Sequence, residues 1–157
     1  MRSRPTLRSI RSRAVQIERV EACHLADIAE IEKLCFAFPW SENALALLTK
    51  EGAVGFAAIC DGRVAAYGGM LCVLDEGQIT NVATHPELRR RGYAKEVMRA
   101  LIDYAKGNGI NTITLEVRAS NARAISMYED LGFYRVGERK NFYKKPIEAA
   151  VLMQKDI

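Results

Sequence analysis

Residues 84–110 read THPELRRRGYAKEVMRALIDYAKGNGI, and their core is the hexapeptide RRRGYA at residues 89–94. After Gly92 the apolar side chains recur at helical spacing, and the pattern stops at a glycine, as expected for a helix C-terminus. The stretch therefore predicts a helix whose first turn follows three arginines. Because a helix N-terminus already carries the positive end of the helix dipole, these cations would repel one another unless an anion lies between them.

The turn at Gly92 has the composition of an anion-binding turn. Glycine lets the backbone approach a ligand closely, successive N–H groups can converge on that ligand, and the small Ala94 permits the same approach further along. The chain contains neither G-x-x-x-x-G-K-[ST] nor G-x-G-x-x-G, so two familiar phosphate motifs are excluded. A pyrophosphate would suit the turn, and a solvated basic helix start is the alternative interpretation.

Strand and helix patterns extend from this stretch in both directions. Asp61-Gly62 marks a hairpin between two apolar runs, and Ser41 has the position of an N-cap for a short helix. Along the chain, the periodicities predict the order β-α-α-β-β-β-α-β-α-β-β. This order indicates one α/β domain built on a mixed sheet.

The positive net charge belongs to one end of the sequence. Residues 1–13 hold five of the 23 basic side chains and no acidic one, whereas the other 18 are balanced by 19 acidic side chains. We therefore expect residues 1–14 to form a flexible Arg-rich extension and residues 15–157 to form the domain. The extension could contact RNA electrostatically, and its acid-free composition also resembles a short transit peptide. The near-neutral domain itself is not expected to bind nucleic acid.

Composition also argues against membrane and metal sites. No apolar run approaches the roughly 18 residues that span a bilayer, so we expect a cytoplasmic protein without membrane association. With His24 and His85 as the two histidines, no metal site is expected. Four cysteines lie in apolar surroundings without a C-x-x-C pair, and we expect buried free thiols at Cys23, Cys35, Cys60 and Cys72.

Three segments resemble one protein family. The hexapeptide fits the pattern [QR]-x-x-G-x-[GA] and resembles the acyl-CoA-binding turn of the GNAT (Gcn5-related N-acetyltransferase) superfamily. Residues 115–133, LEVRASNARAISMYEDLGF, and residues 38–45, FPWSENAL, resemble segments of the bacterial RimI-type ribosomal-protein alanine N-acetyltransferases. The resemblance extends over residues 15–155 and is most specific between Glu116 and Phe133.

The resemblance implies a single GNAT-like domain with a mixed, mostly antiparallel sheet flanked by helices. Acetyl-CoA, as cosubstrate, would lie in a cleft between two splayed central strands, with no metal involved. In the family, backbone amides of the strand before the turn bind the acyl carbonyl and pantetheine, the turn binds the pyrophosphate, and an asparagine also contacts the cofactor. The matching residues here are Val82, Ala83, Thr84, Arg89, Arg90, Arg91, Gly92, Tyr93, Ala94, Lys95 and Asn121.

The resemblance assigns the proton transfers to two side chains. Glu116, on the polar face of the strand TITLEVR, would be the general base, and an exposed glutamate paired with Arg118 is the alternative. Tyr128 lies seven residues after Asn121 on nearly the same helical face and would protonate the CoA thiolate, with a core aromatic as the alternative. A phenol with a pKa of about 10 gives its proton uphill to a thiolate with a pKa of about 8.5, so Tyr128 should accelerate the reaction without being indispensable.

Amine pKa values favour a protein N-terminus as the acceptor. An α-amino group titrates at about 7.7–8.0 and a lysine at about 10.4, so far more of the former is neutral at pH 7. Together with the resemblance, this predicts acetylation of a protein N-terminus, with the N-terminal alanine of a ribosomal protein as the acceptor. The chain differs from the family pattern at Ala149, where an acid is common, and at His85, which we expect to be a solvated loop residue.

Two other functions are compatible with the same fold. One is acetylation of a small-molecule amine. The other is binding without turnover, either as an acyl-CoA-binding module or as an RNA-associated protein that uses the Arg-rich extension. The presence of Glu116 and Tyr128 argues against the second, because cofactor binding alone requires neither side chain.

Overall fold

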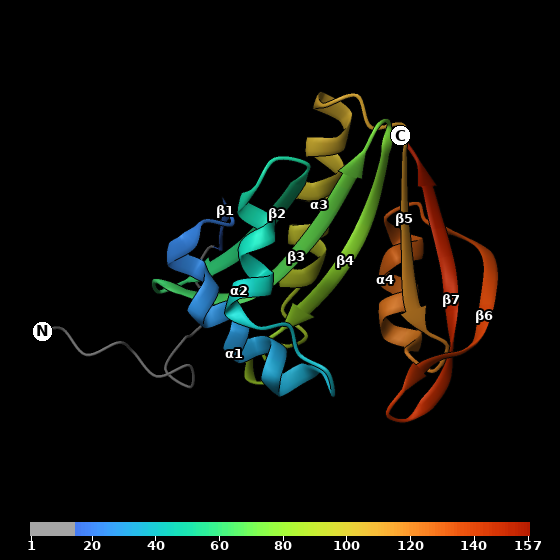
Figure 1. The fold of residues 1–157 in the computed structure, drawn as a ribbon, viewed down its shortest axis with the longest axis horizontal. Coiled ribbons are helices and arrows are strands. Elements are labelled where there is room, and N and C mark those ends of the chain that lie inside the picture. Colours follow the sequence, from blue (N-terminus) through green and yellow to red (C-terminus); the bar gives the residue numbers. More distant parts are fainter. Residues whose placement is uncertain (1–14) are drawn as a thin grey trace, which may run out of the picture.

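The computed structural model describes residues 15–157, which form a seven-stranded sheet flanked by helices (Figure 1). Residues 1–14, the expected Arg-rich extension, lie outside the described residues. The strands are β1 (Gln16–Arg19), β2 (Ala53–Cys60), β3 (Arg63–Val73), β4 (Glu76–Thr84), β5 (Thr112–Arg118), β6 (Tyr134–Lys144) and β7 (Ile147–Asp156). They lie in the order β1-β2-β3-β4-β5-β7-β6, and the only parallel pair in this sheet of the described chain is β4–β5.

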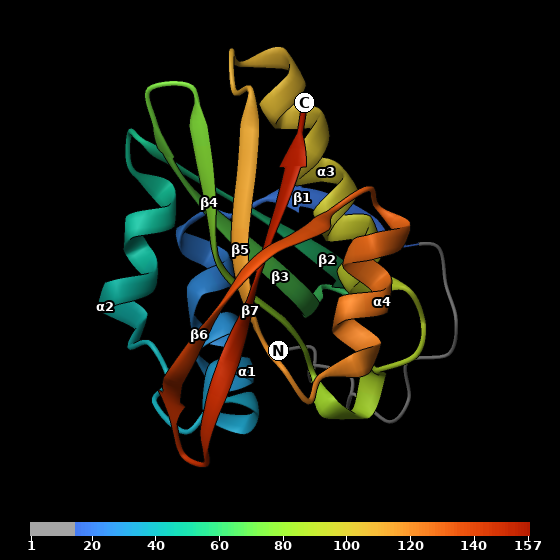
Figure 2. The ribbon, with the colours of Figure 1, turned by 90° about the vertical axis from the view of Figure 1, so that its right-hand side faces the viewer.

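Helices cover both faces of the sheet. They are α1 (Leu25–Cys35), α2 (Glu42–Leu45), α3 (Tyr93–Gly107) and α4 (Ala122–Asp130). Figure 2 shows α1 and α2 on one face and α3 and α4 on the other. The predicted order of strands and helices is confirmed, and Ser41 caps α2, its Oγ accepting a hydrogen bond from the Ala44 N–H at 3.1 Å. No helix of residues 15–157 is both long and apolar enough to cross a bilayer.

The apolar face of α3 fixes this helix against the sheet. Val97, Leu101, Ile102 and Ala105 are buried, and α3 packs on β2 and β3. Gly68 of β3 leaves room for the helix, since a Cβ there would lie 2.9 Å from Val97 Cγ1 and 3.1 Å from Leu101 Cδ1. The close approach gives the N-terminal turn of α3 a fixed place beside β4.

The two central strands separate part of the way along. β4 and β5 pair through residues 76–78 and 112–114. Beyond these pairs β4 continues to Thr84 and β5 to Arg118 without pairing with each other, and Figure 1 shows the two strands diverging. The predicted splayed central strands are therefore present.

A β-bulge lies in β4 where this strand leaves β5. On its other side β4 pairs with β3, and the register shifts between Gly68, opposite Val82, and Met70, opposite Ile79. The interval from Gly68 to Met70 spans two residues on β3, whereas the matching interval from Val82 to Ile79 spans three on β4. The extra residue of β4 therefore lies at positions 80–81. A bulge bends its strand and increases the local twist, which turns the end of β4 away from β5.

Two expectations about individual side chains are wrong. His85 is buried rather than solvated, because its Nδ1 accepts a hydrogen bond from the Glu87 N–H at 3.2 Å and so caps the 3₁₀ turn Pro86–Leu88. The four cysteines are free thiols, as predicted, but Cys60 is the buried one, whereas Cys23 is exposed and the other two are partly exposed.

Replacing Gly68 should push α3 away from the sheet. In Gly68→Val the new side chain would collide with Val97 and Leu101, and we expect the free energy of unfolding to fall by about 1–3 kcal/mol, as for other overpacked cores. Urea titration followed by circular dichroism measures this change. Gly107→Ala is the control, because a Cβ at Gly107 meets no atom within 4 Å. Equal losses in both variants would contradict the tight contact at Gly68.

Candidate active site

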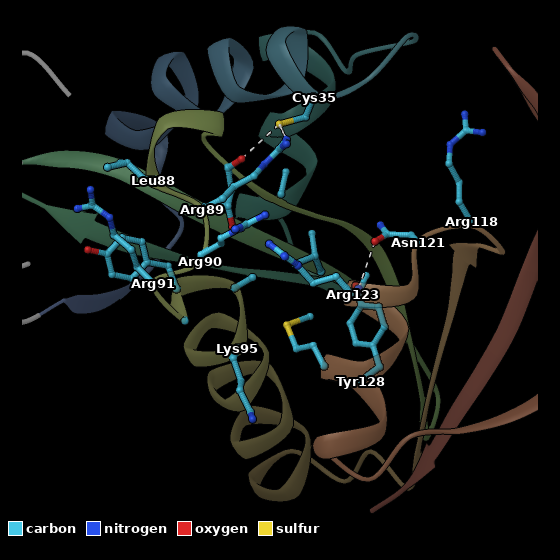
Figure 3. A pocket seen from close by; sticks show the side chains of 18 of the residues that line it. Cys35, Leu88, Arg89, Arg90, Arg91, Lys95, Arg118, Asn121, Arg123 and Tyr128 are labelled. Atoms are coloured by element: carbon cyan, nitrogen blue, oxygen red, sulfur yellow. Dashed lines mark hydrogen bonds between the residues drawn. The ribbon is translucent and has the colours of Figure 1, made fainter. Parts of the chain in front are cut away.

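A cavity of about 560 Å³ lies at the divergent ends of β4 and β5 (Figure 3). Its walls come from the end of α1, the end of β4, the turn that follows β4, the start of α3, the last residue of β5, and α4 with its preceding loop. The lining residues are Cys35, Phe36, Val82, Ala83, Thr84, Leu88, Arg89, Arg90, Arg91, Gly92, Tyr93, Ala94, Lys95, Arg118, Asn121, Arg123, Ala124, Met127 and Tyr128. All residues predicted to bind the cofactor lie on this wall, as does Tyr128.

The turn before α3 has a left-handed backbone at two positions. Arg90 has a φ of 67°, and Gly92, the N-cap of α3, has a φ of 80°. The first hydrogen bond of the helix runs from the Glu96 N–H to the Gly92 carbonyl at 3.1 Å, so the N–H groups of residues 93–95 have no partner inside the helix. A Cβ on Gly92 would meet no atom within 4 Å. The backbone therefore favours glycine here, and open space lies in front of the helix end.

Positive charge is concentrated around the cavity. Among the described residues that line it, none is a carboxylate and six are cations: Arg89, Arg90, Arg91, Lys95, Arg118 and Arg123. Figure 3 shows Arg123 pointing from α4 toward the arginine turn. Lys95 and Arg118 have acidic partners, with Nζ of Lys95 3.6 Å from Asp130 and Nη1 of Arg118 3.2 Å from Glu148. In residues 15–157 no cluster of histidine, cysteine and acidic side chains could hold a metal. The cavity suits an anion.

Two side chains of the hexapeptide have partners within the protein. Tyr93 is buried, its hydroxyl accepts a hydrogen bond from Cys60 Sγ at 3.3 Å, and burial raises its pKa. Arg89 donates from Nη2 to Cys35 Sγ at 3.4 Å. Tyr93 therefore contributes its backbone to the cavity, while its ring anchors the start of α3 in the core.

Asn121 and Tyr128 lie on one side of α4. Asn121 is the N-cap, and its Oδ1 accepts a hydrogen bond from the Ala124 N–H at 3.2 Å. Tyr128 is only 7% exposed, and its ring packs edge-on against Phe133 with 5.8 Å between centroids. Burial, and secondarily the nearby Tyr143, raises the pKa of Tyr128 above its ordinary value. Tyr128 is thus both a core aromatic and a residue of the cavity wall.

Glu116 lies outside the cavity wall. It is half-buried on β5, opposite Leu152 of β7. Burial, and secondarily the charge of Glu116, raises the pKa of Tyr143, so the carboxylate lies near that ring. The ion pair of Arg118 is with Glu148 rather than with Glu116, and its guanidinium stacks over Tyr143 at 4.3 Å from the centroid. The structure thus places Glu116 near Tyr143, for which the sequence left both a place in the peptide groove and plain packing open.

Sequence reasoning missed seven residues of the wall: Cys35, Phe36, Leu88, Arg118, Arg123, Ala124 and Met127. Helical spacing from Asn121 could have found Ala124, three positions further on the same face, but not Arg123 or Met127. No sequence signal identifies Cys35, because its place depends on α1 ending beside β4, where Cys35 Sγ donates to the Thr84 carbonyl at 3.4 Å.

These features define a class of protein. Cations and the N–H groups of a helix end suit phosphate groups. The end of β4 pairs with β3 but not with β5, so its free edge offers backbone groups to an extended ligand, and a tyrosine lines the same cavity. A mixed sheet opened in this way, with these groups at the opening, is the architecture of an acyl-CoA-dependent acyltransferase.

The profile of the Acetyltransferase (GNAT) family matches residues 25–133, so the chain belongs to this family. It is an acetyl-CoA-dependent N-acetyltransferase.

Two relatives share one name. The ribosomal protein bS18-alanine N-acetyltransferase of Escherichia coli (strain K12) is 39% identical over 127 residues, which cover 81% of this chain and 86% of the relative. Its Haemophilus influenzae counterpart is 35% identical over 140 residues, which cover 87% of this chain and 95% of the relative.

Solved structures show the same fold. The crystal structure of the Escherichia coli ribosomal-protein-S18-alanine N-acetyltransferase has a TM-score of 0.84 at 36% identity and covers 92% of this chain and 94% of its own. Arabidopsis thaliana NAA60 in complex with acetyl-CoA has a TM-score of 0.83 at 17% identity, with coverage of 92% and 99%, and supports the fold alone.

Replacing Gly92 should weaken binding of coenzyme A. In Gly92→Val the side chain would fill the space before the helix end, and we expect the Kd for coenzyme A to rise by about tenfold or more, through loss of charge-assisted hydrogen bonds. Isothermal titration calorimetry measures the Kd for coenzyme A. Gly109→Val is the matched control, since Gly109 also has a positive φ, of 72°, and open space around its Cβ. An unchanged affinity in Gly92→Val, or an equal loss in the control, would contradict the assignment of this turn.

Proposed function

We propose that this protein transfers the acetyl group of acetyl-CoA to the α-amino group of a protein N-terminus, and that the acceptor is the N-terminal alanine of ribosomal protein bS18. The observation that carries the proposal is identity of 35–39% over most of the chain with relatives of that name. The splayed strands and the cationic cavity support it. A ribosomal acceptor would place the reaction in the cytoplasm.

The residues of the cavity fit acetyl-CoA in order along the wall. The N–H groups of residues 93–95, with Arg90 and Arg123 beside them, would hold the pyrophosphate. The backbone of residues 82–84, which finds no partner on β5, would hold the pantetheine arm and the acyl carbonyl. Asn121, whose Oδ1 is occupied as the cap of α4, would contribute its Nδ2. The bound cosubstrate supplies an activated acyl group as a thioester.

The protein would supply the proton transfers. Tyr128, kept protonated by its raised pKa, can donate its hydroxyl proton to the leaving sulfur. Its elevated pKa also makes complete transfer to a thiolate more uphill than for an ordinary tyrosine, so the hydroxyl acts chiefly as a hydrogen-bond donor. Glu116 would accept the amine proton through a water, because its carboxylate is not part of the cavity wall.

The acceptor side of the cavity suits a peptide better than a small amine. Phe36 lies on the wall, and the neighbouring Phe38 is 63% exposed. Lys145, in the turn between β6 and β7, lies over the Phe38 ring with its Nζ 5.5 Å from the centroid. Exposed aromatics beside a cavity mouth mark surfaces that bind other molecules. A small-molecule amine remains the second candidate.

Acetylation of a peptide panel tests the proposed function. Thiol release from acetyl-CoA would be followed with peptides that begin with Ala, Ser, Met or Gly, and with an N-terminally blocked peptide that contains an internal lysine. We expect the highest kcat/KM for the alanine peptide with the bS18 sequence, and little activity on the lysine control. Faster turnover of a small amine such as a polyamine than of every peptide would overturn the proposal.

The two proton-transfer residues should differ in pH dependence. Because burial raises the pKa of Tyr128, the phenol stays protonated across pH 6–9, and Tyr128→Phe should lower kcat by a similar factor, about a hundredfold or less, at every pH. In the wild type, kcat/KM should rise as the acceptor amine loses its proton at about pH 8, with no alkaline fall caused by Tyr128.

Glu116→Gln should lower kcat and leave the Kd for coenzyme A unchanged. Glu129→Gln, an exposed change on α4, is the control and should leave kcat as it is. If Glu116→Gln turns over normally from pH 6 to pH 9, Glu116 is not the base.

A further inference from the structure

A fully buried carboxylate lies beside the cavity without lining it. Glu32, on α1, is 0% exposed. Its Oε1 accepts hydrogen bonds from the Tyr67 hydroxyl and from Asn81 Nδ2, the latter at 2.8 Å, and its Oε2 accepts one from the Trp40 backbone N–H at 3.2 Å. The reaction proposed above uses none of these groups.

The three donors come from three separate segments. Tyr67 lies in β3, Asn81 in β4, and Trp40 in the connection between α1 and α2. Burying a carboxylate is costly unless its oxygens are hydrogen-bonded, so the arrangement is favourable only while all three segments keep their positions. An apolar residue of the same size in place of a buried charged one often gives the same stability. The carboxylate of Glu32 therefore points to a role in holding these segments in position.

The bond to Asn81 holds the β-bulge of β4. Asn81 is one of the two residues at the bulge, and it immediately precedes Val82, the first residue of β4 on the cavity wall. The backbone at this point has no ladder partner on β5 to fix its direction. The Asn81 side chain therefore ties to α1 the stretch of β4 that pairs with β3 but not with β5.

The bond to Trp40 holds the other side of the cavity. Residues 36–41, which we term the acceptor loop, leave α1 at Phe36 on the cavity wall and lead to the N-cap of α2. Trp40 packs against the buried cluster under α1, and its N–H is bound by Glu32. One carboxylate thus fixes the acceptor loop relative to the bulge of β4.

We propose that Glu32 is a positioning residue, which aligns the acceptor loop with the bulged segment of β4 so that the amine meets the acyl group. The acceptor half of this inference rests on the proposed function. Glu32 does not touch the reacting atoms and acts through Asn81 and Trp40.

Glu32→Gln tests the proposal with an almost isosteric change. A carboxamide accepts hydrogen bonds only at its oxygen, so its NH₂ group must face either the Trp40 N–H, which is a donor, or the pair Tyr67 and Asn81, whose side chains would have to turn to offer an oxygen. We expect faster hydrogen exchange at the Trp40 or Val82 amide and a rise of about tenfold in the KM for the peptide acceptor, the loss typical of a hydrogen bond to a charged group. The Kd for coenzyme A should change less than the KM.

Two variants separate positioning from general stability. Tyr67→Phe removes one donor from the same carboxylate but leaves the bonds to Asn81 and Trp40, so it should lower the Tm without shifting the peptide KM. Glu30→Gln, on an exposed part of α1, should change neither quantity. If Glu32→Gln does not fold, Asn81→Ala gives the same test for β4 through exchange at Val82.

Two results would overturn the inference. One is unchanged exchange at both Trp40 and Val82 in Glu32→Gln. The other is faster exchange with a peptide KM equal to that of the wild type. Because the exchange measurement needs no acceptor, it decides on the positioning role even if the wild-type protein acetylates none of the peptides. That result would contradict the proposed function and would leave the positioning role of Glu32 to be decided by the exchange measurement.

Discussion

The separation of β4 from β5 is the constraint on which the site depends. In a continuous parallel ladder the backbone groups of both strands would be paired, and no ligand could use them. Here pairing ends at residues 78 and 114, and the bulge at positions 80–81 turns the remaining part of β4 aside. Buried backbone groups need partners, so the open segment at residues 82–84 is prepared for an extended ligand. The first turn of α3 lies at the end of this segment because Gly68 lets the helix approach the sheet closely.

The turn before α3 is anchored in the core by apolar side chains on both sides of the arginines. Tyr93 fixes the first turn through its buried ring, and Leu88 does the same on the other side of the turn. The guanidinium groups of Arg89, Arg90 and Arg91 lie on exposed residues, where water weakens their mutual repulsion. The result is a rigid set of N–H groups surrounded by adaptable cations, an arrangement that suits a diphosphate.

Periodic patterns predicted the elements and their order, because strands and helices with one buried face must show that face in the sequence. The part of the cavity wall around Gly92 was also predictable, since Gly92 and its neighbours form a local motif. Features that depend on contacts between distant segments of the chain were not predictable. His85 is buried because it caps a turn, Cys35 reaches the cavity because α1 ends there, and Arg123 points toward the arginine turn only once α4 packs beside it. Glu116 lies at the position that the resemblance indicated, yet it is not among the residues of the cavity wall.

The two glutamates near the site differ in what their surroundings allow. A carboxylate offers about four lone-pair positions, and Glu32 uses three of them for donors in a fully buried place. Taking a proton from a substrate would break at least one of these bonds and would require a path through packed side chains. Glu116 is half-buried on the same face of β5 as Arg118, which lines the cavity. Its charge contributes to the raised pKa of the nearby Tyr143. Glu32, whose oxygens are already hydrogen-bonded, therefore suits alignment, and Glu116 suits proton transfer.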